Sequence, residues 1–252
     1  MPNTISNGLL FSFPKLKVLV FHCTSFSLVN SVLLGCPVLE VLVVNCDPSC
    51  FQEERLSIRV PSLKVLWLHN MMNVIFCVLE LDSPGLLHFY HYGYMPVFYP
   101  AMKMRSLSVA RLNVNETGGQ RQVMANGQAI VALNACSDVV RIYLSHRKML
   151  YRVPNRIPSF PKLVDLGIIG MNHTHGWEVL LGFVARAPNL KNIYVKANFH
   201  TEGYRRFKAA VKETMSVVDI IDNPDMFQLK IERRNVQNGE NCLCICGGAV
   251  VN

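Results

Sequence analysis

A recurring pattern constrains the fold of this 252-residue chain more than any other feature of its sequence. Six segments share the form x-Pro-x-Leu-x-x-apolar, and they start at Phe13, Cys36, Val60, Ser83, Phe160 and Ala187. Two weaker copies, from Ala101 and Cys136, keep the apolar spacing without the proline. The proline or its equivalent stands at positions 14, 37, 61, 84, 102, 137, 161 and 188, at intervals of 23, 24, 23, 18, 35, 24 and 27 residues. Such a period predicts a stack of similar units.

Each copy has the alternation of a short strand. In Leu16-x-x-Leu19-x-Phe21 the last two apolar residues are two apart, which puts them on one face of a strand, and the proline keeps a helix from running into it. Helical spacing precedes two prolines, at Leu28, Val32 and Leu33 and again at Trp177, Leu180, Leu181 and Val184. We therefore predict an α/β leucine-rich-repeat solenoid, with a curved parallel sheet on its concave face and helices and loops on its convex face. The long fifth interval leaves room for an insertion around residues 115–126.

The repeats resemble a known family. GCPVLEVLVVNCD, VPSLKVLWLHN and WEVLLGFVARAPNLKNIYV look like repeats of plant F-box/LRR proteins, many of which end in an FBD segment, and residues 180–191 match the run that opens that segment. The resemblance covers about residues 13–235. Cys23 and Cys46 depart from it, because each stands one residue before the usual Asn/Cys position. It implies leucine-rich repeats over 1–176, an FBD-like C-terminal repeat and cap over 177–235, and a tail over 236–252.

The resemblance also implies a function. In that family the repeats select a target protein, and the F-box tethers it to a cullin ubiquitin ligase through a Skp-type adaptor. Because the repeats begin within fifteen residues of Met1, we expect this chain to lack the F-box and not to bind the adaptor by itself. The expected function is a protein-interaction scaffold resembling the substrate-recognition part of such a ligase. Two alternatives stay open, the repeat region of an intracellular immune receptor and a nonfunctional truncated product.

Charge is distributed unevenly along the chain. The net charge is +8, and residues 81–200 hold the whole excess, with thirteen basic and five acidic side chains. Its densest run is Arg141, Arg147, Lys148, Arg152 and Arg156. No recognisable module of stacking aromatics and glycine-rich loops surrounds this run, so a basic face that meets an acidic protein is favoured over a nucleic-acid groove.

The longest uncharged stretch and the N-terminus indicate where in the cell the chain is located. The longest uncharged stretch, residues 18–39, carries too many polar side chains for a spanning helix, and the N-terminus has no basic region typical of a signal peptide. We expect no membrane association, reduced cysteines, and a cytoplasmic or nuclear location.

Candidate chemistry is sparse. Among the nine cysteines, Cys46 and Cys50 have the two- to four-residue spacing typical of zinc ligands, and the terminal Cys242, Cys244 and Cys246 alternate as in a strand. His173 and His175 have no third ligand nearby. The sequence contains no hydrolase elbow, zinc-protease, Walker or dinucleotide motif. We therefore expect no cofactor, no metal and no enzymatic activity.

The positions beside the inward leucines point to a binding surface. The column after the second inward residue reads Val20, Val43, Trp67, Tyr90, Ser108, Tyr143, Gly167 and Tyr194. The column two residues further on reads His22, Asn45, His69, Tyr92, Ala110, Ser145, Ile169 and Lys196. Aromatic groups on a wet face are typical of protein-binding sites, although strand aromatics can also pack as a cross-strand ladder. The predicted partner-binding residues on the concave face are Trp67, His69, Tyr90, Tyr92, Arg141, Tyr143 and Tyr194.

Overall fold

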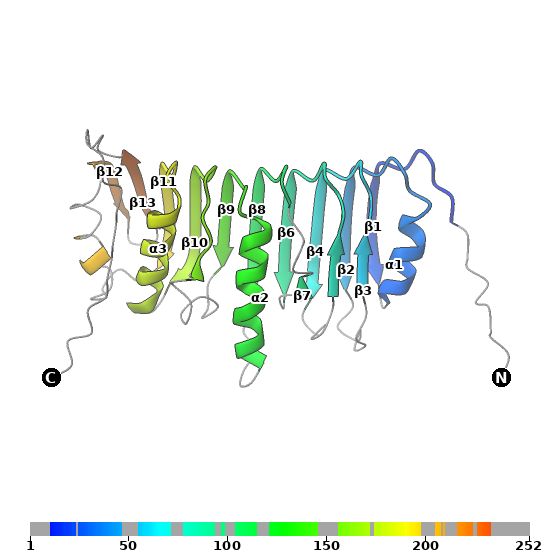
Figure 1. Cartoon of the computed structure of the whole chain (residues 1–252), viewed down its shortest axis with the longest axis horizontal. Coiled ribbons are helices and arrows are strands. Elements are labelled where there is room, and N and C mark those ends of the chain that lie inside the picture. The colour runs from blue at the N-terminus through cyan, green and yellow to red at the C-terminus, as the bar shows by residue number, and fades with distance from the viewer. Residues whose placement is uncertain are drawn as a thin grey trace.

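A ten-stranded sheet runs the whole length of the molecule (Figure 1). The computed structural model describes residues 11–23, 25–46, 55–71, 78–93, 97–98, 104–114, 121–145, 156–171, 174–197, 205–207, 209, 216–223 and 226–232. Eight parallel strands follow chain order: β1 (Val18–Cys23), β2 (Val41–Cys46), β4 (Val65–Met71), β6 (His88–Gly93), β8 (Val109–Val114), β9 (Arg141–Ser145), β10 (Asp165–Met171) and β11 (Asn192–Ala197). The predicted leucine-rich-repeat solenoid is confirmed.

The pairing changes from parallel to antiparallel at the C-terminal end of the sheet. Strand β13 (Met226–Glu232) pairs antiparallel with β11, and β12 (Ser216–Asn223) pairs antiparallel with β13. The boundary predicted at residue 177 falls inside helix α3 (Thr174–Arg186), between the paired strands β10 and β11. The predicted tail over 236–252 lies outside the described residues.

The described segments that return the chain to the next strand include both helices and strands. Helices α1 (Phe26–Leu33), α2 (Arg121–Ala135) and α3 follow β1, β8 and β10, and the first and third match the predicted helical spacing. Between β2 and β8 the return segments are instead strands, β3 (Arg55–Ile58), β5 (Val78–Leu81) and β7 (Val97–Phe98), which form a second parallel sheet. Residues 121–126, where an insertion was expected, form the start of α2.

Side chains of the inward face form the core. Leu42, Leu66 and Leu166 have no exposed surface, and Phe26 of α1 and Trp177 of α3 are each 1% exposed. The core is one continuous cluster along the described units, in which each unit covers the inward residues of its neighbours. One inward-facing position holds a polar residue. His91 is 2% exposed at a position that is leucine on both adjacent strands.

Backbone hydrogen bonds in the turns fix the register of every described unit. Two successive amides of one unit donate to the same carbonyl of the unit before it, as when Glu40 and Val41 donate to Lys17 O and Lys64 and Val65 donate to Glu40 O. The same pair of hydrogen bonds is formed by Ser108 and Val109, whose amides both donate to the carbonyl of Leu87.

The hydrogen bonds from Ser108 and Val109 to Leu87 O correct the sequence-based alignment of the fifth repeat. Ser108 lies at the turn, three residues before the position assigned to it, and Tyr90 pairs with Arg111. The proline-equivalent position is therefore Arg105 instead of Met102, because the amide of Leu107 donates to Met104 O as that of Leu86 donates to Ser83 O. Ala110 is buried and faces the core, so the two columns read Arg111 and Asn113 where Ser108 and Ala110 were expected.

Hydrogen bonds cap helix α1 and join it to the second sheet. Its N-cap is Ser25, whose hydroxyl accepts from the amide of Ser27. From the same helix, the Asn30 side chain donates to Arg55 O and accepts from the amide of Ser57. These bonds satisfy backbone groups of β3, an edge strand of the second sheet. Among the described residues, no helix is long and apolar enough to cross a membrane.

Candidate functional site

The side of the sheet that faces away from the helices, called here the open face, carries three rows of aligned side chains. The first row is Val18, Val41, Val65, His88, Val109, Arg141, Asp165 and Asn192. The second row is Val20, Val43, Trp67, Tyr90, Arg111, Tyr143, Gly167 and Tyr194. The third row is His22, Asn45, His69, Tyr92, Asn113, Ser145, Ile169 and Lys196. All seven predicted binding residues lie in these rows.

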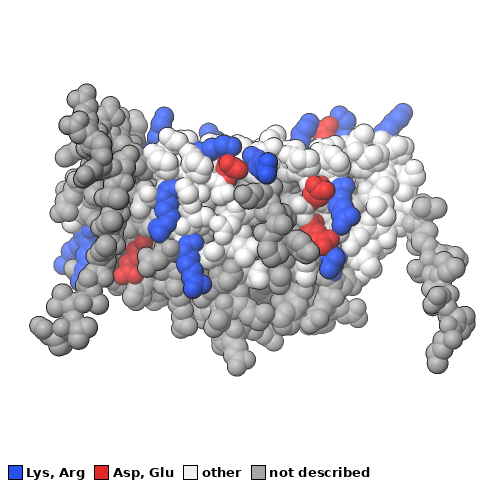
Figure 2. Space-filling view, viewed as in Figure 1, with Lys and Arg blue, Asp and Glu red and all other residues white. Residues whose placement is uncertain are grey.

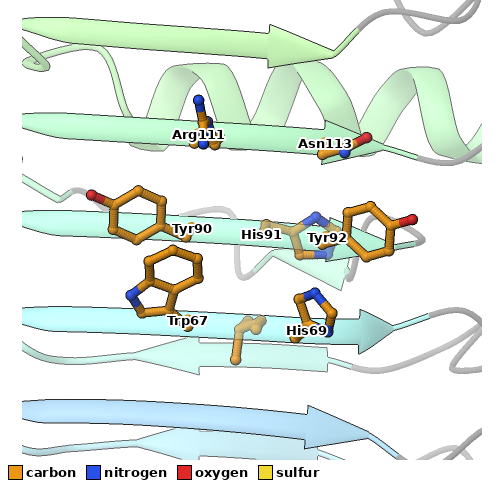
Figure 3. A pocket seen from close by; sticks show the side chains of 8 residues that line it. Trp67, His69, Tyr90, His91, Tyr92, Arg111 and Asn113 are labelled. Carbon is orange, nitrogen blue, oxygen red and sulfur yellow. The ribbon is translucent and has the colours of Figure 1, made fainter.

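Two stacked ring pairs lie at the centre of the open face. The rings of Trp67 and Tyr90 are 4.0 Å apart between centroids at an interplanar angle of 18°, and those of His69 and Tyr92 are 5.0 Å apart at 17°. Figure 3 shows both pairs side by side on β4 and β6. Trp67 keeps 38% of its surface exposed despite this contact. Cross-strand stacking thus holds the rings in fixed positions without removing them from solvent.

A hollow of about 170 Å³ lies between the two ring pairs and strand β8. Its lining residues are Trp67, Leu68, His69, Tyr90, His91, Tyr92, Arg111 and Asn113. Arg111 and Asn113 form the β8 side of the hollow in Figure 3. Sequence reasoning missed both residues because the fifth repeat has no proline to mark its start. The alternation Ala110-x-Leu112 was the signal that could have placed them on the open face.

Arg111 extends the ring ladder beyond the hollow. Its guanidinium carbon lies 5.6 Å from the centroid of the Tyr143 ring, within the range of a cation–π contact. On the other side Tyr143 leans over Gly167, where a Cβ atom would overlap ring atom Cδ1. A residue without a side chain is thus what lets Tyr143 lie flat in the second row. Gly167 also separates Tyr143 from Tyr194, which pairs in register with the glycine.

The predicted site residue Arg141 lies in the first row and is engaged with a neighbour. Its Nε atom is 2.9 Å from Oδ2 of Asp165, whose other oxygen accepts a 2.6 Å hydrogen bond from the side chain of Asn192. These three residues form a polar ladder across β9, β10 and β11. The charge of Arg141 is therefore balanced within the protein, unlike that of Arg111, which forms no ion pair with any described residue.

The charges at the edge where the strands begin also form cross-repeat pairs. Glu40 lies between Lys17 at 3.0 Å and Lys64 at 2.7 Å, and Lys162 lies 3.3 Å from Asp138. Hydrogen bonds from Lys64 and Lys17 lower the pKa of the Glu40 carboxyl below its ordinary value. Figure 2 shows basic and acidic side chains mixed along this upper edge. The mixture indicates solvated pairs linking neighbouring repeats.

The cysteines whose side chains the structure describes, Cys36, Cys46 and Cys136, are buried. Cys36 and Cys136 occupy equivalent turn positions with no exposed surface. Burial raises the pKa of both thiols, that of Cys136 to about 12. In the described part of the chain no three His, Cys, Asp or Glu side chains come together as metal ligands. The other cysteines weighed above, Cys50, Cys242, Cys244 and Cys246, lie outside the described residues, as does His173.

The chain folds as a leucine-rich-repeat solenoid and is similar to plant F-box/LRR-repeat proteins. It is 32% identical over 199 residues to F-box/LRR-repeat protein At2g42730 of Arabidopsis thaliana, 28% identical over 197 residues to At4g14096 and 29% identical over 210 residues to At4g14103. These alignments cover 72, 74 and 76% of the chain.

The chain matches only part of each relative. The alignments cover 42, 42 and 54% of the three relatives, so the chain spans about half of their length or less. No family model matches the chain. The resemblance seen in the repeats is nevertheless confirmed by these plant F-box/LRR-repeat relatives.

Proposed function

We propose that this chain is the substrate-recognition region of an F-box/LRR protein of a cullin ubiquitin ligase, and that it binds its target on the open face. The partly exposed row of Trp67, Tyr90 and Tyr143 carries the proposal. Tryptophan and tyrosine are enriched at binding hot spots because they bury a large area at little cost in side-chain entropy. The opposite side of the sheet is taken up by the core. Sequence similarity to plant F-box/LRR proteins supports this function over an immune-receptor role.

Binding is tested by truncating the rings. The target is isolated from plant extract on the immobilised chain, identified, purified and then titrated directly into the protein. Trp67→Ala and Tyr90→Ala should each weaken binding, and at least one by about 2 kcal/mol, roughly 30-fold in Kd. Phe13→Ala is the matched control, because Phe13 is a 43% exposed aromatic in the turn before β1. Equal losses for Phe13→Ala and Trp67→Ala would show that the open face is not the site.

The ligase role needs a separate measurement. In plant cells, disrupting the gene that encodes this chain should lengthen the half-life of the isolated target, and restoring the wild-type gene should shorten it again. Restoring a Trp67→Ala version should leave the half-life long. A target whose half-life does not respond to the gene would argue for a scaffold with no role in ubiquitylation.

A further inference from the structure

The hollow on the open face has the size of a pocket for one side chain. Its volume of about 170 Å³ is well below the roughly 300 to 1,000 Å³ of sites for cofactors and drug-sized ligands. Trp67 and Tyr90 bound it at one end, His69 and Tyr92 at the other. Ring walls of this kind favour an apolar side chain inserted between them.

The rim of the hollow carries one uncompensated positive charge. Arg111 is exposed on β8, one strand away from Tyr90, and forms no ion pair with any described residue. Asn113 lies two residues further along the same strand and adds an amide. The one other arginine of the three rows, Arg141, is neutralised by Asp165, the one acidic residue of the rows. The hollow therefore attracts a negatively charged group.

The number of charges indicates which anion fits. Phosphate groups on partner proteins are usually held by clusters of arginines, and nucleic acids need several cations along their backbone. A single guanidinium, which contacts the Tyr143 ring but forms no ion pair with any described residue, fits one carboxylate, with which it can form two parallel hydrogen bonds.

Together these observations specify the partner's chemistry. We propose that the hollow receives one apolar side chain of an acidic partner peptide, and that an Asp or Glu carboxylate of the same peptide binds Arg111. This inference rests on the proposed function and names the chemistry recognised there. Neighbouring strands are about 4.8 Å apart and an extended peptide advances about 3.3 Å per residue, so the acidic residue lies within one or two positions of the apolar one.

A displayed library of random nonapeptides, selected on the full chain at 150 mM salt, tests the proposal. Selected peptides should pair an apolar residue with Asp or Glu one or two positions away. Synthetic copies should bind Arg111→Gln at least tenfold more weakly than wild type. Arg105→Gln is the matched control, since Arg105 is an exposed arginine in the turn before β8. It removes the same charge outside the open face and should change Kd less than twofold.

The other outcomes separate this inference from the proposed function. Peptides that depend on Trp67 but show no acidic preference, and bind Arg111→Gln normally, would overturn the acidic-peptide inference and leave open-face binding standing. Equal losses for Arg105→Gln and Arg111→Gln would also overturn the inference, because they would show diffuse attraction to a basic chain. If no peptide is selected, or if Trp67→Ala has no effect on those that are, both the inference and open-face binding fall. Circular dichroism of each variant confirms that it is folded.

Discussion

Adjacent residues on β4 should respond in opposite ways to truncation, and this contrast tests the register of the whole sheet. Leu66 has no exposed surface, so Leu66→Ala leaves a cavity between repeats and should cost about 2 to 5 kcal/mol of unfolding free energy. Trp67 is 38% exposed and stacks on Tyr90 across one strand boundary. Losing one such ring pair should cost about 1 kcal/mol.

The assay is urea and thermal unfolding followed by circular dichroism. For a chain of this size 1 kcal/mol shifts Tm by roughly 2 to 4 °C, so Leu66→Ala should lower Tm by about 4 to 20 °C and Trp67→Ala by about 2 to 4 °C. Target binding should show the reverse order once each variant is measured well below its Tm. If Trp67→Ala lowers the unfolding midpoint as much as Leu66→Ala, then Trp67 belongs to the core and every open-face assignment is wrong.

Three further predictions follow from local contacts. Because burial raises the pKa of the Cys136 thiol to about 12, native protein should protect it from a thiol reagent at pH 8, and stability should fall as pH rises above roughly 8.5, where the unfolded thiol loses its proton first. The lowered pKa of Glu40 means that its contribution is present above the ordinary carboxyl pKa and is lost as pH falls through the lower folded value, so Glu40→Gln should flatten the acid side of the stability curve measured by urea midpoints. Gly167→Ala should push the Tyr143 ring aside at a cost of about 1 kcal/mol, visible as a changed ring-current shift on Arg111 by NMR, and unchanged shifts would refute the packing of Tyr143 over Gly167.

The sequence predicts the stacked strands well because burial imposes the same alternation on every unit. Leu42, Leu66 and Leu166 are buried in the core on one face of their strands. Their spacing therefore determines which residues lie on the opposite face. Seven of the eight repeats could be aligned from this pattern alone. The exception is the fifth, where Met104-x-x-Leu107 imitates the spacing of Leu107-x-x-Ala110. The small side chain of Ala110 in the core hides the true register.

Two other features could not be derived from the repeat. The second sheet rests on short alternations, Leu56-x-Ile58 and Leu79-x-Leu81, which are too brief to distinguish from a turn without the neighbouring unit to pair with. The hollow on the open face depends on how rings from adjacent strands stack, and a one-dimensional pattern gives the row of a residue without its side-chain direction. The predicted residues therefore lie in the rows of the open face, while the hollow beside Arg111 is seen in the structure alone.

The most direct test of open-face recognition is hydroxyl-radical footprinting of the purified complex between this chain and its target. Oxidation of Trp67, Tyr90 and Tyr143 should fall several-fold on binding, since these rings are partly exposed in the free protein. Oxidation of Leu34, which is 89% exposed at the end of α1, should stay unchanged. Protection of Leu34 with no change at Trp67 would place the target on the helical side and contradict the account.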